Sequence, residues 1–269
     1  KLEKLNGVTK FLGGTANDRF KLEEGGELGT FYGYVDAGRF YENDEEVWAL
    51  KPFDPTTGRP ANFYRANSFT EGAGDIYIVD LDGDGKITAD GDRKILGSAN
   101  PKVFGGFGST LIWKGLMFNM TFTYSLGGKR FWDGEASKFG GVNVYNAPNL
   151  VLDSWTMKGP GATYPIITHY GVGQNSVFTN RWLHDASYMR LSALNLSYRL
   201  PQKWFSKYLI KGIEATFQAT NLFTITKYPG MDPQGNFSTS GSALYGTGTD
   251  YSTYPAAKTF NFGLKLTID

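Results

Sequence analysis

The sequence contains no cysteine and only two histidines, His169 and His184, among its 269 residues. The absence of thiols excludes disulfide bonds, thiolate metal sites and cysteine nucleophiles within this chain. Two imidazoles are too few for a zinc site built from several histidines. An excess of charge is also missing, because 27 Lys and Arg residues balance 26 Asp and Glu residues. With no basic excess to neutralise phosphates, we expect no nucleic acid as a main partner.

Long hydrophobic runs are absent as well. We find no run of about 18 apolar residues, so the sequence predicts no transmembrane helix. Residues 1–10 lack the apolar stretch of a secretory signal peptide, and we expect none in this chain. These absences leave a membrane β-barrel open, because its strands cross a bilayer with alternating rather than continuous apolar residues.

Glycine and aromatic residues are abundant instead. The chain has 35 Gly, 20 Phe, 16 Tyr and 6 Trp residues. Glycine alone makes up about 13% of the chain, against a usual share of about 7%. This combination is typical of a β-rich chain with long turns.

Period-two alternation predicts about six strands of roughly 9 to 12 residues, longer than the usual 5 or 6 of globular domains. In the clearest, Leu116, Phe118 and Met120 point one way, while Met117, Asn119 and Thr121 point the other. A tight turn at Lys114-Gly115 joins this strand to the one before it. The six expected strands cover residues 27–35, 103–113, 116–125, 194–199, 213–220 and 259–269.

Alternation by itself leaves two architectures open. A soluble β-sandwich turns its apolar face inward, whereas an outer-membrane barrel turns it toward lipid and its polar face toward a lumen. The connections favour the barrel, because residues 42–74, 132–181 and 227–257 are long while 201–203 is a short polar link. In that architecture the expected lumen-facing residues are Asn195, Ser197, Arg199, Glu214, Thr216, Gln218 and Thr220.

An acidic loop begins at Asp80 and matches the first half of an EF-hand-type calcium loop. Carboxylates stand at positions 1, 3 and 5, glycine at position 6, and position 7 supplies a backbone carbonyl. Position 12 is Gly91, and a one-residue insertion brings Asp92 into that place. The alternative is a solvated turn capped by its own Asp side chains. The predicted ligands of a structural Ca²⁺ are Asp80, Asp82, Asp84, Lys86, Asp90 and Asp92.

Five segments in sequence order resemble a signature of SusC/RagA-type TonB-dependent outer-membrane transporters. The first, Leu28-Gly29-Thr30-Phe31-Tyr32-Gly33-Tyr34, precedes one that runs from Gly74 through the acidic loop to Pro101. The third includes Asp185-Ala186-Ser187-Tyr188-Met189-Arg190-Leu191 and continues to Pro201. The last two begin at Asn221-Leu222-Phe223 and at Tyr254-Pro255. The resemblance covers most of the chain from about residue 25 onward.

The resemblance implies an all-β fold in which residues 1–269 form the C-terminal strands of a large antiparallel barrel, 22-stranded in the whole protein, with long extracellular loops. The plug, the TonB-contacting segment and the first strands are then outside this chain. Such a protein imports an oligosaccharide or a peptide across the bacterial outer membrane. Its implied partners are a SusD-like surface lipoprotein, TonB, the remaining barrel strands and the lipid bilayer.

Two other classes of protein are open to the sequence. An enzyme is not expected, because no pair of catalytic residues stands out and the adjacent His184 and Asp185 point apart on a strand. A soluble carbohydrate-binding β-sandwich stabilised by calcium shares the aromatic residues and the acidic loop. That alternative predicts shorter strands and short loops at both ends.

Overall fold

A computed structural model describes the chain over residues 10–12, 19–43, 45–46, 53–54, 59–60, 72–84, 87–139, 149–167, 175, 177–205, 210–235, 248–251 and 253–268. The chain divides into two compact units, each assembled from segments distant in sequence. Unit 1 comprises residues 1–100, 129–184 and 236–252. Unit 2 comprises residues 101–128, 185–235 and 253–269. None of the helices in the described ranges has the length and hydropathy of a membrane span.

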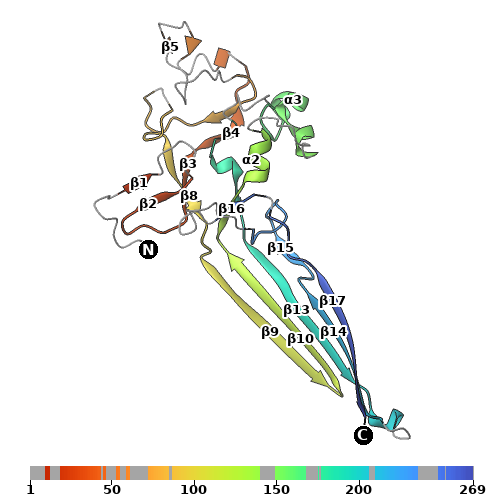
Figure 1. Ribbon diagram of the computed structural model, residues 1–269. Helices are drawn as coiled ribbons and strands as arrows, with labels where there is room; N and C mark the ends of the chain where they lie inside the picture. The colour runs from red at the N-terminus through yellow and green to blue at the C-terminus, as the bar shows by residue number, and fades with distance from the viewer. Residues whose placement is uncertain are drawn as a thin grey trace. The chain divides into compact units, whose positions relative to one another are not determined.

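Unit 2 contains a long antiparallel sheet (Figure 1). Its strands are β9 (Val103–Trp113), β10 (Leu116–Leu126), β13 (Tyr188–Arg199), β14 (Ile210–Thr220) and β17 (Thr259–Ile268). They lie in the order β17-β14-β13-β10-β9, and the short β15 (Thr224–Thr226) pairs with the start of β13. Sequence order is therefore also spatial order, as in a meander. The predicted strands between residues 103 and 268 are confirmed, and β13 begins earlier than expected.

The two ends of this sheet differ, as the sequence predicted. At one end Lys114 and Gly115 join β9 to β10 with φ values of 45° and 87°. Positive φ at both central positions defines the type I′ turn that matches the twist of paired strands. A 3₁₀ turn, Gln202–Trp204, follows β13 at the same end, before β14 begins. The long connections leave from the opposite end.

Two β-bulges interrupt the ladder. Between β10 and β13, Thr121 pairs with Ala193 and Phe122 pairs with Leu191, so Ser192 is an extra residue. A second bulge lies at the start of β14. A bulge inserts one extra residue, so the residues beyond it point to the opposite face from the one that simple alternation would give, and the local twist increases. Arg190 and Asn195 consequently lie on the same face of the sheet despite their odd spacing.

Unit 1 is built from short strands and short helices. Two-stranded sheets pair β1 (Lys10–Leu12) with β2 (Lys21–Glu23), β3 (Thr30–Tyr34) with β8 (Arg93–Ser98), β4 (Asp36–Phe40) with β7 (Ile76–Ile78), and β5 (Phe53–Asp54) with β6 (Arg59–Pro60). A three-stranded sheet has the order β12 (Leu183–Asp185), β11 (Lys129–Trp132), β16 (Thr249–Asp250). Helices within the described residues include α2 (Asp133–Phe139) and α3 (Trp155–Lys158), and 3₁₀ turns include Asn149–Asp153, Gly159–Gly161 and Asn180–Trp182.

Aromatic side chains from distant segments form the core of unit 1. Phe31, Phe139 and Trp182 are fully buried, and Phe139 stacks on Trp182 with ring centroids 5.8 Å apart. Phe131 and Phe178 join the same cluster. The connection expected over residues 132–181 therefore contributes Phe139 and Phe178 to a packed core. Much of the connections expected over residues 42–74 and 227–257 lies outside the described residues. The strand expected at residues 27–35 is present as β3, but it is short and pairs with β8 in unit 1.

Candidate functional site

The acidic loop runs from the end of β7 to the start of β8 in unit 1. Its backbone is organised by the carboxylates themselves: Asp80 Oδ1 accepts a hydrogen bond from the Gly83 amide at 2.7 Å. Asp82 Oδ1 accepts one from the Asp84 amide at 3.2 Å. Strands rather than helices flank the loop within the described residues.

Three carboxylates converge in this loop. One carboxylate oxygen each from Asp80, Asp82 and Asp84 lie within 4.8 Å of one another. Two oxygen ligands about 2.4 Å from one calcium ion are at most about 4.8 Å apart, so a single ion would be within reach of all three carboxylates. Asp90 is exposed and is not part of this group, and Lys86 lies outside the described residues. Calcium binding and its ligand set stay a prediction.

The side chain of Asp92 stabilises the loop through hydrogen bonds to its backbone. This side chain is fully buried, and its two oxygens accept hydrogen bonds from the Leu81 amide at 2.7 Å and the Thr88 amide at 2.6 Å. Gly91 leaves room for this arrangement, because a Cβ there would lie 2.1 Å from Asp82 Oδ2. The sequence predicts Asp92 as a ligand of the ion, and that role stays a prediction beside its two hydrogen bonds from backbone amides.

The carboxylates repel one another in this arrangement. The hydrogen bond from the Asp84 amide lowers the pKa of Asp82, but partial desolvation and the charges of Asp84 and Asp92 raise it, and the net shift is upward. A raised carboxyl pKa means that the ionised form is disfavoured by its neighbours. A bound divalent cation would relieve this repulsion.

The second candidate site is the polar face of the long sheet in unit 2. We define the polar face as the face of the sheet on which the side chain of Asn195 lies. Opposite residues in a ladder share a face, so the register arranges the side chains in rows across the strands. The central row of this face contains Thr110, Asn119, Asn195, Gln218 and Asn261, one residue from each long strand. Asn119 Nδ2 donates to Thr110 Oγ1 at 2.7 Å within this row.

The two rows on either side of the central row contain no charged residue. Toward the long connections Thr121, Thr220 and Thr259 share a row, and Thr220 Oγ1 lies 2.5 Å from Thr259 Oγ1. Toward the short turns Arg199, Glu214 and Lys265 stand side by side. The seven residues expected in the lumen thus share one face. That this face lines a lumen stays a prediction.

The opposite, apolar face is defined by the side of Phe118 and is largely uncovered. β10 contributes Leu116, Phe118, Met120, Phe122 and Tyr124, and β17 contributes Phe260, Phe262, Leu264, Leu266 and Ile268. Phe262 is 82% exposed and Leu264 is 67% exposed. The separation is imperfect on β9, where Phe104 and Ile112 lie on the polar side.

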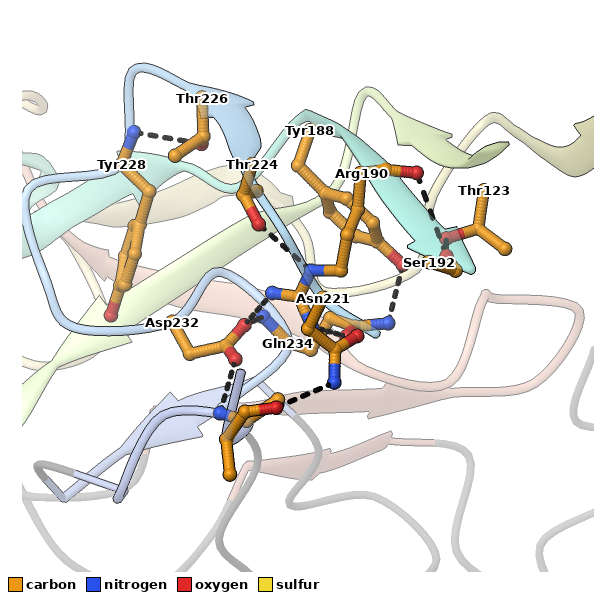
Figure 2. A network of polar contacts seen from close by, with 12 residues as sticks. Thr123, Tyr188, Arg190, Ser192, Asn221, Thr224, Thr226, Tyr228, Asp232 and Gln234 are labelled. Carbon is orange, nitrogen blue, oxygen red and sulfur yellow. Dashed lines mark hydrogen bonds and ion pairs between the residues drawn. The ribbon is translucent and has the colours of Figure 1, made fainter. Parts of the chain in front are cut away.

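The sequence did not identify a buried polar network at the end of the polar face that carries the long connections (Figure 2). Arg190 on β13 lies at its centre and forms an ion pair with Asp232 at 2.7 Å. Both side chains are less than a tenth exposed. Arg190 belongs to the polar face because it pairs with Thr123 in the ladder. Its partner is 42 residues away in sequence, so no local pattern marks it.

His184 also has a partner that the sequence did not reveal. His184 Nε2 lies 2.5 Å from Glu135 Oε2, and the Tyr164 hydroxyl donates to Glu135 Oε1 at 3.0 Å. Burial and the nearby Glu135 carboxylate raise the pKa of Tyr164. The cluster joins β12, α2 and the segment after α3 within unit 1. Asp185 Oδ1 accepts hydrogen bonds from the amide and the hydroxyl of Ser187.

The chain is related in sequence to TonB-dependent receptors. It is 29% identical over 252 residues to TonB-dependent receptor P3 of Formosa agariphila, covering 91% of this chain and 22% of that receptor. It is 32% identical over 96 residues to TonB-dependent receptor SusC of Bacteroides thetaiotaomicron, covering 35% of this chain and 8% of SusC. The chain therefore spans about a fifth of the length of the P3 receptor. No protein-family model matches it.

The fold is similar to that of solved transporters. The structure of the RagAB peptide transporter matches with a TM-score of 0.65 at 24% identity, covering 97% of this chain and 24% of that one. The RagAB peptide importer in the "open-open" state matches with a TM-score of 0.64. These matches confirm the expected barrel-type antiparallel sheet. The relatives are receptors, which agrees with the expectation that this chain is not an enzyme.

Proposed function

We propose that this chain, a relative of the SusC-type TonB-dependent receptors, forms part of the barrel wall of an active importer in the bacterial outer membrane. The observation that carries the proposal is the two-sided sheet of unit 2. Its strands of 10 to 12 residues have the length that a tilted transmembrane strand needs. The sequence relatives support the same class of protein.

Exposure of the apolar face supports its contact with lipid. Soluble monomers rarely expose a contiguous apolar patch of more than a few hundred Å². Here large side chains such as Phe262 and Leu111 are more than half exposed on strands at opposite edges of the sheet. A bilayer covers such a face without a protein partner, and the polar face then lines the aqueous interior.

The sheet edges indicate what completes the wall. Within the described residues, β9 and β17 each pair with a neighbour on one side alone. Open edges are not tolerated in lipid, because their amide and carbonyl groups have no water to bind. We therefore assign to both edges the remaining strands of the same barrel.

The partners and cargo follow from the proposed class. We assign to the importer a SusD-like surface lipoprotein and energy from TonB, which acts outside this stretch. The cargo is an oligosaccharide or a peptide, and the solved neighbour is a peptide transporter. The neutral hydrogen-bonding rows of the polar face suit either, since both present hydroxyl or amide groups.

We also propose that the acidic loop holds a structural Ca²⁺ on Asp80, Asp82 and Asp84. The spacing of the three carboxylates and the raised pKa of Asp82 support this. Asp92, through its bonds to two backbone amides, would keep the loop in a conformation ready for the ion. The ion would stiffen the connection between β7 and β8 and take no part in transport chemistry.

The sharpest test uses neighbouring residues on β17. Asn261→Cys and Phe262→Cys in the full-length receptor place a thiol on opposite faces of one strand. In cells, we expect a charged thiosulfonate to modify position 261, and a lipid-soluble maleimide alone to modify position 262. A calcium-stabilised soluble sandwich, the second candidate, would leave position 262 inaccessible to both reagents in a dry core. That result would refute the barrel.

A further inference from the structure

Residues 228–235, which we call the strap, follow β15 and turn onto the polar face of the sheet. The contacts that hold the strap come from polar-face residues. Arg190 pairs with Thr123 and with Thr224 in the ladders, so its side chain lies on the side of Asn119 and Asn195. Asp232 and Gln234 of the strap both contact this arginine (Figure 2). The strap therefore lies against the face that we assign to the lumen.

Arg190 uses three nitrogens for three different acceptors. Nε donates to Thr224 Oγ1 at 2.8 Å, one terminal nitrogen to Gln234 Oε1 at 2.6 Å, and the other to Asp232 Oδ1 at 2.7 Å. The planar guanidinium fixes all three directions at once, which a lysine ammonium on a flexible stem cannot do. Bonds of this kind are strong because one or both partners are charged.

Further bonds hold the strap at a second point and bring in another segment. Gln234 Nε2 donates to the Tyr188 hydroxyl at 2.5 Å, again on the polar face. Asp232 also accepts hydrogen bonds from the Gln234 amide at 2.9 Å and the Ala256 amide at 3.2 Å. Asp232 thus connects the wall to the segment that leads into β17.

Tight packing fixes the shape of the strap itself. Tyr228 is 5% exposed, and a Cβ on Gly230 would lie 2.5 Å from its ring. Pro233 and Gly235 are buried as well, whereas Met231 is 65% exposed. A segment with this many buried contacts opens less often than a solvated loop.

We infer that the strap is a fixed ledge that narrows the mouth of the importer's lumen, with Arg190 as its positioning residue. This inference rests on the proposed function, because the polar face becomes the lumen wall when the barrel closes. A ledge fixed to the inner wall limits the size of solutes that pass from the end with the long connections to the central row of Asn119, Asn195 and Gln218. Arg190 sets that limit by holding the strap inward.

The test measures thiol access past the strap. Asn195→Cys in a cysteine-free full-length receptor places a probe in the central row, and intact cells are treated with a small charged thiosulfonate or a maleimide on a long polyethylene glycol chain. In the parent we expect fast modification by the small reagent and slow modification by the bulky one. Arg190→Ala is expected to speed the bulky reaction by about tenfold or more, since the two hydrogen bonds from Arg190 to Asp232 and Gln234 no longer oppose opening of the strap.

Two variants control for misfolding and for loss of charge. Arg190→Lys keeps the charge but loses the fork, so we expect an intermediate rate. Arg199→Ala removes an arginine from the same face of the same strand, beside Glu214 rather than Asp232, and should match the parent. All variants are compared for folded receptor in the outer membrane.

The outcomes separate the ledge from the barrel. If the bulky reagent modifies position 195 at the same rate in Arg190→Ala and in the parent, the inference is overturned. It is also overturned if the small reagent fails to modify position 195 in all of the variants. The companion variant Leu194→Cys tests the proposed function separately, because its thiol should face lipid. If the charged reagent modifies position 194 and spares position 195, the orientation of the wall is wrong and the proposed function fails with it.

Discussion

An arginine scan along β13 tests whether the apolar face lies in a bilayer. Five residues of this strand belong to that face: Met189, Leu191, Leu194, Leu196 and Tyr198. A two-residue step of about 6.8 Å, tilted by about 40°, advances about 5 Å along the membrane normal. Five rows therefore span about 20 to 25 Å, close to the height of the apolar band of an outer-membrane barrel.

The Trp and Tyr residues of β9, β10 and β13 on this face agree with this placement. Trp113 and Tyr198 lie in the first row at the short-turn end, and Tyr124 lies in the fifth. Aromatic residues of barrels concentrate at the two membrane interfaces. Leu194 then lies in the central row, near the bilayer midplane.

The expected costs follow from depth. Leu194→Arg should reduce the free energy of unfolding by about 2–4 kcal/mol, whereas Tyr198→Arg and Met189→Arg should cost about 0–1 kcal/mol. Asn195→Arg is the matched control, since it adds the same side chain next to Leu194 on the polar face. The measurement is the denaturant midpoint of the full-length receptor in phospholipid vesicles.

A flat profile would refute the reasoning. In a soluble sandwich Leu194, Leu196 and Tyr198 would all lie in a dry core, and an unpaired arginine would be costly at each of them. The peaked profile arises only where the surroundings change from hydrocarbon to headgroup along the strand. Equal losses at positions 194 and 198, with none at 195, would therefore favour the sandwich.

Three further predictions concern the acidic loop, the strap and the first hairpin. Millimolar calcium should raise the melting temperature of the receptor, and Asp82→Ala or Asp84→Ala should abolish that rise. Asp90→Ala should keep the rise, because Asp90 lies outside the carboxylate group. An unchanged rise in Asp82→Ala would exclude this site. Burial raises the pKa of Asp232, but hydrogen bonds from the Gln234 amide, Arg190 and the Ala256 amide lower it by more. The pKa of Asp232 is therefore below that of an ordinary aspartate. Its stabilising contribution is therefore complete above the unfolded pKa of about 3.9 and is lost as the pH falls through the lower folded value. The mobility of a spin label at Met231→Cys should stay constant from about pH 8 to pH 5 and rise only below about pH 4. Asp232→Asn should raise that mobility at neutral pH, and a rise near pH 6 in the parent would contradict this anchor. Gly115→Ala should destabilise the receptor by about 1–2 kcal/mol, because φ is +87° and a Cβ would lie 2.7 Å from the Arg199 carbonyl oxygen. The control is Gly212→Ala, because a Cβ there would lie 3.7 Å from Thr267. Equal destabilisation by the two substitutions would refute the argument.

The long strands were predictable because each carries its own signal. Alternation over residues 116–125 and 259–268 depends on neighbours in sequence, and the Lys114-Gly115 turn has a local backbone requirement. The acidic loop was also recognisable from its spacing. Its closure was not, because Asp92 is held by amides of Leu81 and Thr88 that the ligand pattern does not mention.

Unit 1 was not predictable for a related reason. Its core joins Phe31, Phe131, Phe178 and Trp182, which come from three separate stretches of the sequence. No single stretch shows a complete apolar face, so each resembled a loop rich in glycine and aromatic residues. A core that forms only when distant segments meet leaves no periodic signal in any of them.

The two arginines of β13 show where the limit of local patterns lies. Arg190 and Arg199 stand on the same strand and the same face. Arg199 has Glu214 beside it on the adjacent strand, and alternation alone predicted that both lie on the polar face. Arg190 differs only through Asp232 and Gln234, which reach it from a connection whose path the strand pattern does not determine. Periodicity therefore predicted the strands that we assign to the barrel wall. The role that we infer for Arg190, holding the strap at the mouth of the lumen, could be recognised only from the folded path of the strap.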